Sequence, residues 1–337
     1  RASQVLIVPT VVAPAVGPVI GGFLIEHLSW RWVFYVNVPV GLGALVFGAV
    51  FLREHREASA GRFDVPGFVL SGAGLALVLY AISEGPVRGW ASGPVLVAAA
   101  VGLSALVALV RVELRRPDPM LDLHLLGDRL FRTSNAVCLF AYASFLGLLF
   151  VMPLFLQEAR GASALSSGLT TFPEAVGVLL SSQLVGRLYP RVGPRRLMTG
   201  GLTALTALTA SMALLGAGSS EWLIRLLMFV AGAAMAYVIL PQQAATFATI
   251  SSADTGRASA IYNTQRQVAA ALGVAIQATE LTSAAGTGSP RAGDFHLVFL
   301  ACAALAAVGA AMAWTIRDSD AASTMAAASA APAVSVH

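Results

Sequence analysis

Val137-Cys-Leu-Phe-Ala-Tyr-Ala-Ser-Phe-Leu-Gly-Leu-Leu-Phe-Val-Met-Pro-Leu-Phe155 is a run of apolar residues that contains no charged side chain. A helix needs roughly 20 predominantly apolar residues to cross the hydrocarbon core of a bilayer. The chain holds three more uncharged runs of similar length, at residues 65–82, 95–110 and 297–316. These runs predict membrane-spanning helices.

The composition of the whole chain agrees with this interpretation. Hydrophobic residues make up 57% and charged residues only 11% of the 337 residues, and the mean hydropathy is +0.77. A water-soluble domain usually has about 25% charged residues, because it needs them to cover its surface. The charges here are too few for such a surface, so the composition disfavours a soluble helical bundle.

Hydropathy and the placement of Gly and Pro predict ten spans. Lipid-exposed backbone must satisfy its own hydrogen bonds, which only helices and closed barrels achieve. The runs are uniformly apolar and about twice as long as a barrel strand, so we expect helices. The expected spans are residues 4–25, 33–52, 65–84, 93–111, 134–156, 165–186, 197–217, 222–246, 258–280 and 295–316.

The arginines predict the orientation of these spans. All 21 basic residues are Arg, and most of them fall in alternate connections. Only Arg31, Arg88, Arg160 and Arg291 fall in the connections on the opposite side. Cytoplasmic loops carry the excess of positive charge, so we expect the arginine-rich side and the C-terminus to be cytoplasmic. The tail, residues 318–337, is rich in Ala and Ser and is expected to be disordered.

Several other classes of function find little support in the sequence. The net charge of +4 reflects Arg in short loops and does not indicate a nucleic-acid partner. Cys138 and Cys302 both fall inside apolar spans, where they are expected to be small buried residues rather than a disulfide or a metal site. The histidines are not clustered, and no nucleotide-binding or hydrolase motif appears, so no cofactor and no enzyme activity are expected. A non-transporting sensor or scaffold and a membrane-embedded enzyme remain the alternatives to a transporter.

Several motifs resemble those of one transporter family. Pro14-Ala-Val-Gly17-Pro18-Val-Ile-Gly21-Gly22 resembles the antiporter motif of the fifth helix in drug-exporting members of the major facilitator superfamily. The run Ser29-Trp-Arg-Trp-Val-Phe-Tyr-Val-Asn37 that follows is similar to the start of the sixth helix in the fourteen-helix drug:proton antiporters of the EmrB/QacA type. Asn263-Thr-Gln-Arg266-Gln267 resembles part of their thirteenth helix.

The resemblance implies a fold and an organisation. The fold class is all-α and polytopic, a major facilitator fold in which the ten spans are helices 5–14 of 14. Helices one to four of the family then lie outside this chain. Residues 1–52 would be the last two helices of the N-terminal six-helix bundle. Residues 53–133 would hold two extra linker helices, residues 134–317 the C-terminal six-helix bundle, and residues 318–337 the cytoplasmic tail.

The resemblance also implies a function. The expected activity is secondary active transport, in which drugs or other small lipophilic molecules leave the cell in exchange for protons by alternating access. The expected partners are therefore a small-molecule substrate, protons and the lipid bilayer of the cell membrane, with the transporter acting as a monomer. The family's membrane-embedded acid on the first helix lies outside this chain.

Two sets of candidate residues come from small or ionisable side chains within spans. Pro14, Gly17, Pro18, Gly21 and Gly22 are the antiporter motif, whose small residues would let a neighbouring backbone approach closely. A charge in hydrocarbon is costly and normally faces a cavity or a partner. Glu174 and Arg266 are therefore expected to face a central cavity together. The candidates for proton coupling or cavity lining are Glu174, Arg266, Asn263, Gln267, Gln242 and Gln243.

A third set comes from the run between two spans. Gly186, Arg187, Arg191, Gly193, Arg195 and Arg196 resemble the cytoplasmic loop motif of the family in its second-half copy. The position that is usually acidic in that motif is Pro190 here, so a charge relay within this loop is weakened.

Overall fold

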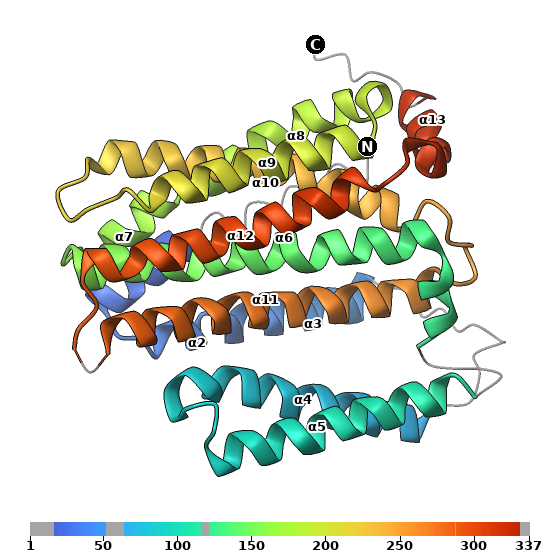
Figure 1. Cartoon of the computed structure of the whole chain (residues 1–337), viewed down its shortest axis with the longest axis horizontal. Helices are drawn as coiled ribbons and strands as arrows, with labels where there is room; N and C mark the ends of the chain where they lie inside the picture. Colours follow the sequence, from blue (N-terminus) through green and yellow to red (C-terminus); the bar gives the residue numbers. More distant parts are fainter. Residues whose placement is uncertain (1–16, 52–63, 116–120, 287, 331–337) are drawn as a thin grey trace.

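The computed structural model describes residues 17–51, 64–115, 121–286 and 288–330, and the regular elements in those ranges are all helical (Figure 1). A helix covers residues 17–27. The labelled α-helices that follow are α2 Trp32–Tyr35, α3 Asn37–Phe51, α4 Val65–Arg88, α5 Gly93–Glu113, α6 Arg129–Leu154, α7 Ala164–Thr171, α8 Pro173–Val192, α9 Pro194–Met212, α10 Glu221–Thr246, α11 Thr255–Ala285, α12 Phe295–Trp314 and α13 Ala322–Ala330. Short 3-10 turns cover Leu123–Gly127, Ala292–Asp294 and Asp318–Ala321, and a π-helical turn covers Phe155–Ala159.

Helices α4 and α6 begin where a polar side chain satisfies a free backbone N–H group. The Asp64 carboxylate accepts from the Gly67 N–H at 2.9 Å, and the Asp128 carboxylate accepts from the Phe131 N–H at 2.7 Å. Such a cap satisfies donors that have no partner within the helix. Seven of the described helical segments are long and apolar enough to cross a membrane, which confirms an all-α, polytopic fold.

Six long helices form one bundle that runs along the longest axis of the molecule (Figure 1). α6 packs against α11 and α12, α9 packs against α12 and α10, and α8 packs against α10. The core between them is apolar. Phe155 lies edge-on to Phe295 and Phe299, with ring centroids 5.4 and 5.9 Å apart, and all three side chains are fully buried.

Glycines set the distance between neighbouring helices in this bundle. A Cβ added to Gly177 of α8 would collide with the backbone oxygen of Phe229 in α10, and one added to Gly232 of α10 would collide with the backbone of Glu174. Gly273 of α11 touches the Ala143 backbone of α6 in the same way. Helices in lipid associate largely through such close approach, since lipid tails are as apolar as the side chains.

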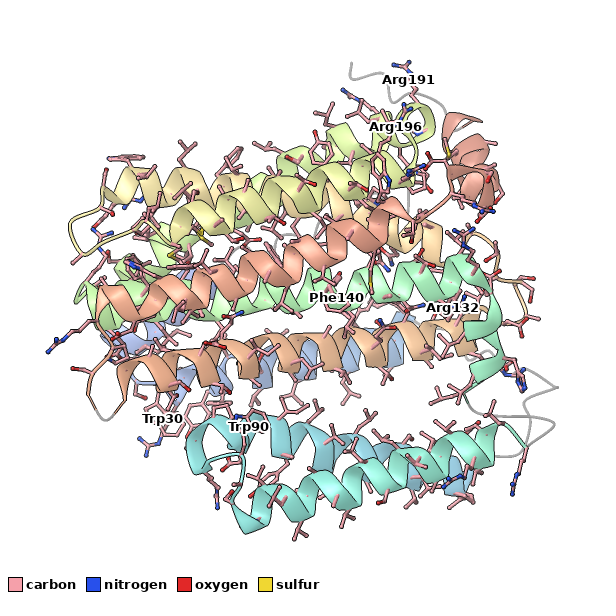
Figure 2. All side chains as sticks on the ribbon, in the orientation of Figure 1. Trp30, Trp90, Arg132, Phe140, Arg191 and Arg196 are labelled. Carbon is pink, nitrogen blue, oxygen red and sulfur yellow. The ribbon has the colours of Figure 1, made fainter. Side chains whose placement is uncertain are left out.

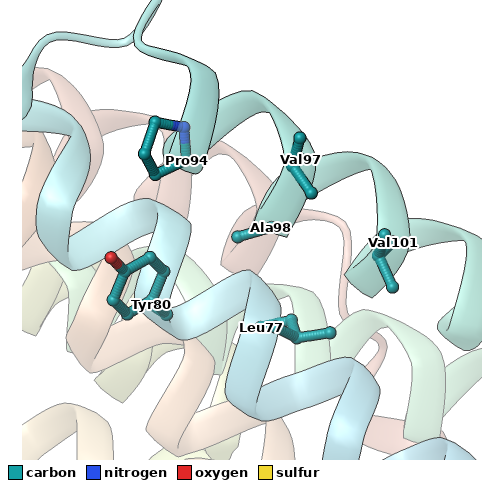
Figure 3. Close-up of a pocket in the computed structure, with 6 residues that line it drawn as sticks. All are labelled: Leu77, Tyr80, Pro94, Val97, Ala98 and Val101. Carbon is teal, nitrogen blue, oxygen red and sulfur yellow. The ribbon is translucent and has the colours of Figure 1, made fainter.

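The hairpin of α4 and α5 lies beside the bundle and packs on α11 (Figure 1). At one end of the hairpin the Trp90 indole N–H donates to the Thr279 hydroxyl of α11 at 3.2 Å. An apolar groove of about 450 Å³ opens between the two helices (Figure 3). It is lined by Leu77, Tyr80, Pro94, Val97, Ala98 and Val101. A groove lined in this way suits lipid or another apolar surface.

The structure differs from the sequence expectation at three places. The expected span 165–186 is broken between α7 and α8, where Pro173 starts a new helix because it lacks a backbone N–H. The expected span 33–52 has one turn residue, Val36, between α2 and α3, and Trp32–Phe51 is still long and apolar enough to cross a membrane. The tail was expected to be disordered, but Asp318–Ala321 and α13 are helical. The Asp318–Ala321 turn packs on α9, and α13 packs on α8.

The predicted domain limits stay predictions. The limit between residues 52 and 53 lies outside the described residues, as do residues 1–16 and 331–337.

We expect Gly273→Leu to destabilise the bundle, because a branched side chain would push α11 away from the Ala143 backbone. Overpacking typically costs about 1–3 kcal/mol. Thermal unfolding of the purified protein in detergent, followed by size-exclusion chromatography, measures the loss. Gly200→Leu is the matched control, since Gly200 is exposed on α9 and a Cβ there meets no described atom within 4 Å. Equal unfolding temperatures for the two variants would contradict the role of close packing.

Candidate functional site

The helix of residues 17–27 meets α7 backbone to backbone. A Cβ on Gly22 would lie 2.6 Å from the Ala164 backbone oxygen, and a Cβ on Gly168 would collide with the backbone oxygen of Pro18. Two glycines, one on each helix, therefore make this contact possible. Because the first of these helices lies near the N-terminus and α7 packs on α6 and α10, the contact joins the N-terminal part to the bundle.

Glu26 extends this contact by one helical turn. Its carboxylate accepts from the Leu165 N–H at 3.1 Å, in the first turn of α7. Hydrogen bonding from Ser163, with that from Leu165 and the charge of His27 as smaller causes, lowers the pKa of the exposed Glu26 carboxyl. A lowered pKa means that the contact favours the ionised form. The stability that the Glu26 hydrogen bonds contribute is therefore present above the carboxyl's usual pKa of 4.5 and is lost as the pH falls through the lowered value.

Glu26 was not among the predicted site residues, although the spacing of the sequence carries a signal for it. Pro18, Gly22 and Glu26 are spaced four residues apart, which places them on one face of a helix. The helix face that contacts α7 therefore extends from Pro18 through Gly22 to Glu26. We call Pro18, Gly22, Glu26, Ala164 and Gly168 the 17–27/α7 contact.

The other members of the antiporter motif take no part in this contact. Gly17 is exposed and Gly21 is half-buried, and a Cβ on either would meet no described atom within 4 Å. Pro14 lies outside the described residues. Of the three described glycines of the motif, Gly22 alone makes the expected close approach to a neighbouring backbone.

A second cluster of polar groups lies between α6, α10 and α11. The buried Gln242 amide donates to the Ser134 backbone oxygen at 3.1 Å and to the Thr246 hydroxyl at 2.8 Å. The Tyr262 hydroxyl donates to the Gln242 side-chain oxygen at 3.3 Å. With its amide satisfied from three sides, Gln242 connects three helices and does not face a wet cavity.

Arg266 lies at the edge of this cluster. Its guanidinium sits 5.8 Å from the ring centroid of Tyr142 on α6, a cation–π contact, and the side chain is half-buried. Asn263 and Gln267 are exposed and lie four residues apart on α11, and Gln243 is exposed on α10. The candidate lining residues therefore divide into exposed polar groups and the buried Gln242.

Glu174 does not pair with Arg266 in this structure. Glu174 lies in the first turn of α8, and its backbone touches α10 at Gly232, whereas Arg266 contacts α6. The described residues contain no ion pair between the two side chains. α7 leads into Glu174 from the end of the bundle at which Glu26 lies, and α11 begins at the opposite end (Figure 1). The chain segments that carry Glu174 and Arg266 thus enter the bundle from opposite ends.

The loop motif lies at the end of the bundle near α13. Figure 2 shows Arg132, Arg191 and Arg196 at that end, and Trp30 and Trp90 toward the other. Gly186, Arg187 and Arg191 belong to the C-terminal half of α8, and Arg195 and Arg196 to the first turn of α9. Gly193 joins the helices with a positive φ of 82°, a conformation that favours glycine.

The chain is similar to known transporters over most of its length. The profile of the Major Facilitator Superfamily matches residues 5–274. A multidrug resistance protein B homolog of Mycobacterium tuberculosis is 30% identical over 286 residues, which are 84% of this chain and 53% of the relative.

Two further relatives carry the names of single antibiotics. The lincomycin resistance protein LmrB of Listeria monocytogenes is 30% identical over 271 residues, 80% of this chain and 58% of the relative. The puromycin resistance protein pur8 of Streptomyces alboniger is 33% identical over 274 residues, 80% of this chain and 54% of the relative. The chain thus spans about half the length of the relatives it matches.

We expect Gly22→Leu to separate the 17–27 helix from α7, because the Ala164 backbone occupies the space of the new side chain. Transport by the intact protein should fall by roughly tenfold or more, the factor that about 1.4 kcal/mol produces. Gly21→Leu, one residue away but with open space at its Cβ position, should stay near the wild-type rate. Efflux from cells with equal amounts of each variant in the membrane is the measurement. A Gly21→Leu defect as large as that of Gly22→Leu would contradict the contact seen here.

Proposed function

Because the chain belongs to the major facilitator superfamily, a family of transporters and not of enzymes, we propose that it works as a proton-coupled exporter. The cargo is a drug or another small lipophilic molecule, and the mechanism is alternating access. The proposed subtype is the fourteen-helix drug:proton antiporter of the EmrB/QacA type, with the ten expected spans as its last ten helices. The proposed partners are the substrate, protons and the lipid bilayer.

The observation that carries this proposal is the 17–27/α7 contact. It joins the N-terminal part to the C-terminal bundle near one end, where Gly22 and Gly168 allow the two backbones to touch. A transporter that exposes its site to one side at a time needs a contact of this kind, which closes one end and can open again. Contacts through glycine backbones and one exposed carboxylate are small enough to break during a cycle.

The arrangement of charges supports an orientation. Arg132, Arg191 and Arg196 share the α13 end of the molecule (Figure 2), and a cytoplasmic side carries the excess of arginine. We therefore place the α13 end and the C-terminus in the cytoplasm, in the cell membrane. In this orientation, the 17–27/α7 contact is proposed to close the external end.

The proposed substrate path runs along the exposed polar groups of the bundle. Asn263, Gln267 and Gln243 offer amides to a ligand, and Arg266 over the Tyr142 ring offers a cation beside an aromatic face. Cavities of this mixed character suit lipophilic molecules with a few polar groups. The relatives named for multidrug, lincomycin and puromycin resistance favour such molecules as cargo.

Glu174 is the proposed proton-coupling acid of this chain. It lies within a predicted span, where an ionised side chain is costly unless it has a partner. Because it forms no ion pair with Arg266 in this structure, we propose that the two side chains act at separate positions along the path. The transporter is proposed to work as a monomer, without nucleic acid or a metal.

The test is transport by the purified intact protein in liposomes with an imposed pH gradient, with ethidium and puromycin as probes. We expect gradient-driven transport of at least one probe. Glu174→Gln should reduce the gradient-driven rate by roughly a hundredfold or more, the lower end of the range for removing one proton-transfer group, while probe binding is retained.

The control is Glu221→Gln. Glu221 is also in the first turn of a helix, but it forms an ion pair with Arg225 at 3.1 Å near the bundle surface. This variant should transport normally. Transport that does not respond to the pH gradient in the wild-type protein would overturn the proton-coupled mechanism. A normal rate in Glu174→Gln would remove Glu174 from it.

A further inference from the structure

Helix α9 begins without a cap of its own. Its N-cap residue is Gly193, which has no side chain, and Pro194 occupies the first helical position. The Arg195 N–H in the first turn has no acceptor within the helix, as is usual for the first residues of a helix. In this structure the acceptor is the carboxylate of Asp318, which lies 123 positions further along the chain. It accepts a hydrogen bond from the Arg195 N–H at 2.9 Å.

The fit between Asp318 and the loop is close. A Cβ on Gly193 would lie 2.7 Å from the carboxylate carbon of Asp318, so the carboxylate occupies the space that any other residue would need. The positive φ of Gly193 favours glycine independently. The loop therefore has both the backbone shape and the empty volume that admit this one carboxylate.

The residues just before Asp318 contact the helices at the α13 end of the bundle. The Arg195 guanidinium lies 4.2 Å from the ring centroid of Trp314, which is a cation–π contact. The Arg129 guanidinium at the start of α6 donates to the Thr315 backbone oxygen at 3.0 Å. The end of α12 is thus joined to both α6 and α9.

The residues after Asp318 reach two more elements. The hydroxyls of Tyr189 on α8 and Thr324 on α13 are 2.7 Å apart and hydrogen-bond each other. The Ser323 hydroxyl donates to the Ala248 backbone oxygen, in the connection from α10 to α11, at 3.3 Å. Met325 packs against the small apolar cluster around Tyr189.

From these contacts we propose that Asp318 is a positioning residue for the loop between α8 and α9. Residues 318–325 form a strap that ties α8, α9 and the α10–α11 connection into one unit. The strap supplies a carboxylate to a loop whose own position 190 is a proline. The loop arginines, Arg191 and Arg196, are exposed beside it and depend on it for their placement. In transport, the strap makes this end of the bundle move as one body.

Hydrogen exchange of the intact protein in lipid nanodiscs tests the cap directly. Asp318→Ala should speed exchange of the Arg195 amide about tenfold, since exchange reports the local opening of a hydrogen bond. Asp318→Asn keeps an oxygen acceptor and should give a smaller increase. Asp320→Ala is the matched control in the same turn, because the Asp320 carboxylate bonds only to the adjacent Ser319 hydroxyl among the contacts described. Unchanged exchange in Asp318→Ala would overturn the cap.

The transport arm tests the positioning role and rests on the proposed function. Asp318→Ala should lower the maximal rate of probe transport severalfold at an unchanged half-saturating probe concentration, Asp318→Asn should be intermediate, and Asp320→Ala normal. Faster exchange with a full transport rate would overturn the positioning role. If Asp318→Ala does not accumulate in the membrane, Asp318→Asn decides both arms. If the wild-type protein moves no probe, the proposed function fails, and the exchange arm still decides the cap.

Discussion

Close approach of helix backbones at glycine is the constraint on which this structure depends. Hydrocarbon offers no hydrophobic force between helices, so short distances and internal hydrogen bonds must hold them together. Gly232 and Gly273 provide such distances inside the bundle, and Gly22 provides one between the N-terminal part and α7. Close approach at glycine thus occurs both in the permanent contacts inside the bundle and in the 17–27/α7 contact, which must break in the proposed mechanism. The difference lies in extent, since α8 and α10 pack over many turns and the 17–27 helix touches α7 around two glycines.

Polar side chains in the predicted spans divide into two groups with different roles. Gln242 is buried and satisfied by Ser134, Thr246 and Tyr262, so it stabilises the junction of α6, α10 and α11. Gln243, the next residue, is exposed on another face of α10. Adjacent amides in one sequence motif therefore separate into a structural residue and a candidate ligand contact, because one residue turns a helix by about 100°.

The helices could be predicted from sequence because the constraint on them is local. A run such as residues 137–155 needs a helix in lipid whatever surrounds it, and the structure confirms helices at the expected spans that it describes. The strap could not be predicted from sequence. Residues 318–325 were expected to be disordered, and the contact that orders them, between Asp318 and the N-terminus of α9, joins residues far apart in the chain. Glu174 and Arg266 were expected to lie together from their similar positions within spans. The structure instead places Glu174 against α10 and Arg266 against α6, and which helices lie side by side depends on the arrangement of the whole bundle.

In the proposed mechanism, the 17–27/α7 contact opens and closes while the opposite end of the molecule does the reverse. Distances between spin labels at Phe23 and Leu169, both exposed beside the contact, measure this most directly in the intact protein, with Cys138 and Cys302 replaced by alanine. A second pair at Phe51 and Ser251, at the other end, completes the measurement. We expect substrate and a proton gradient to lengthen the first distance and shorten the second. Two distances that stay fixed, or that change in the same direction, would contradict it.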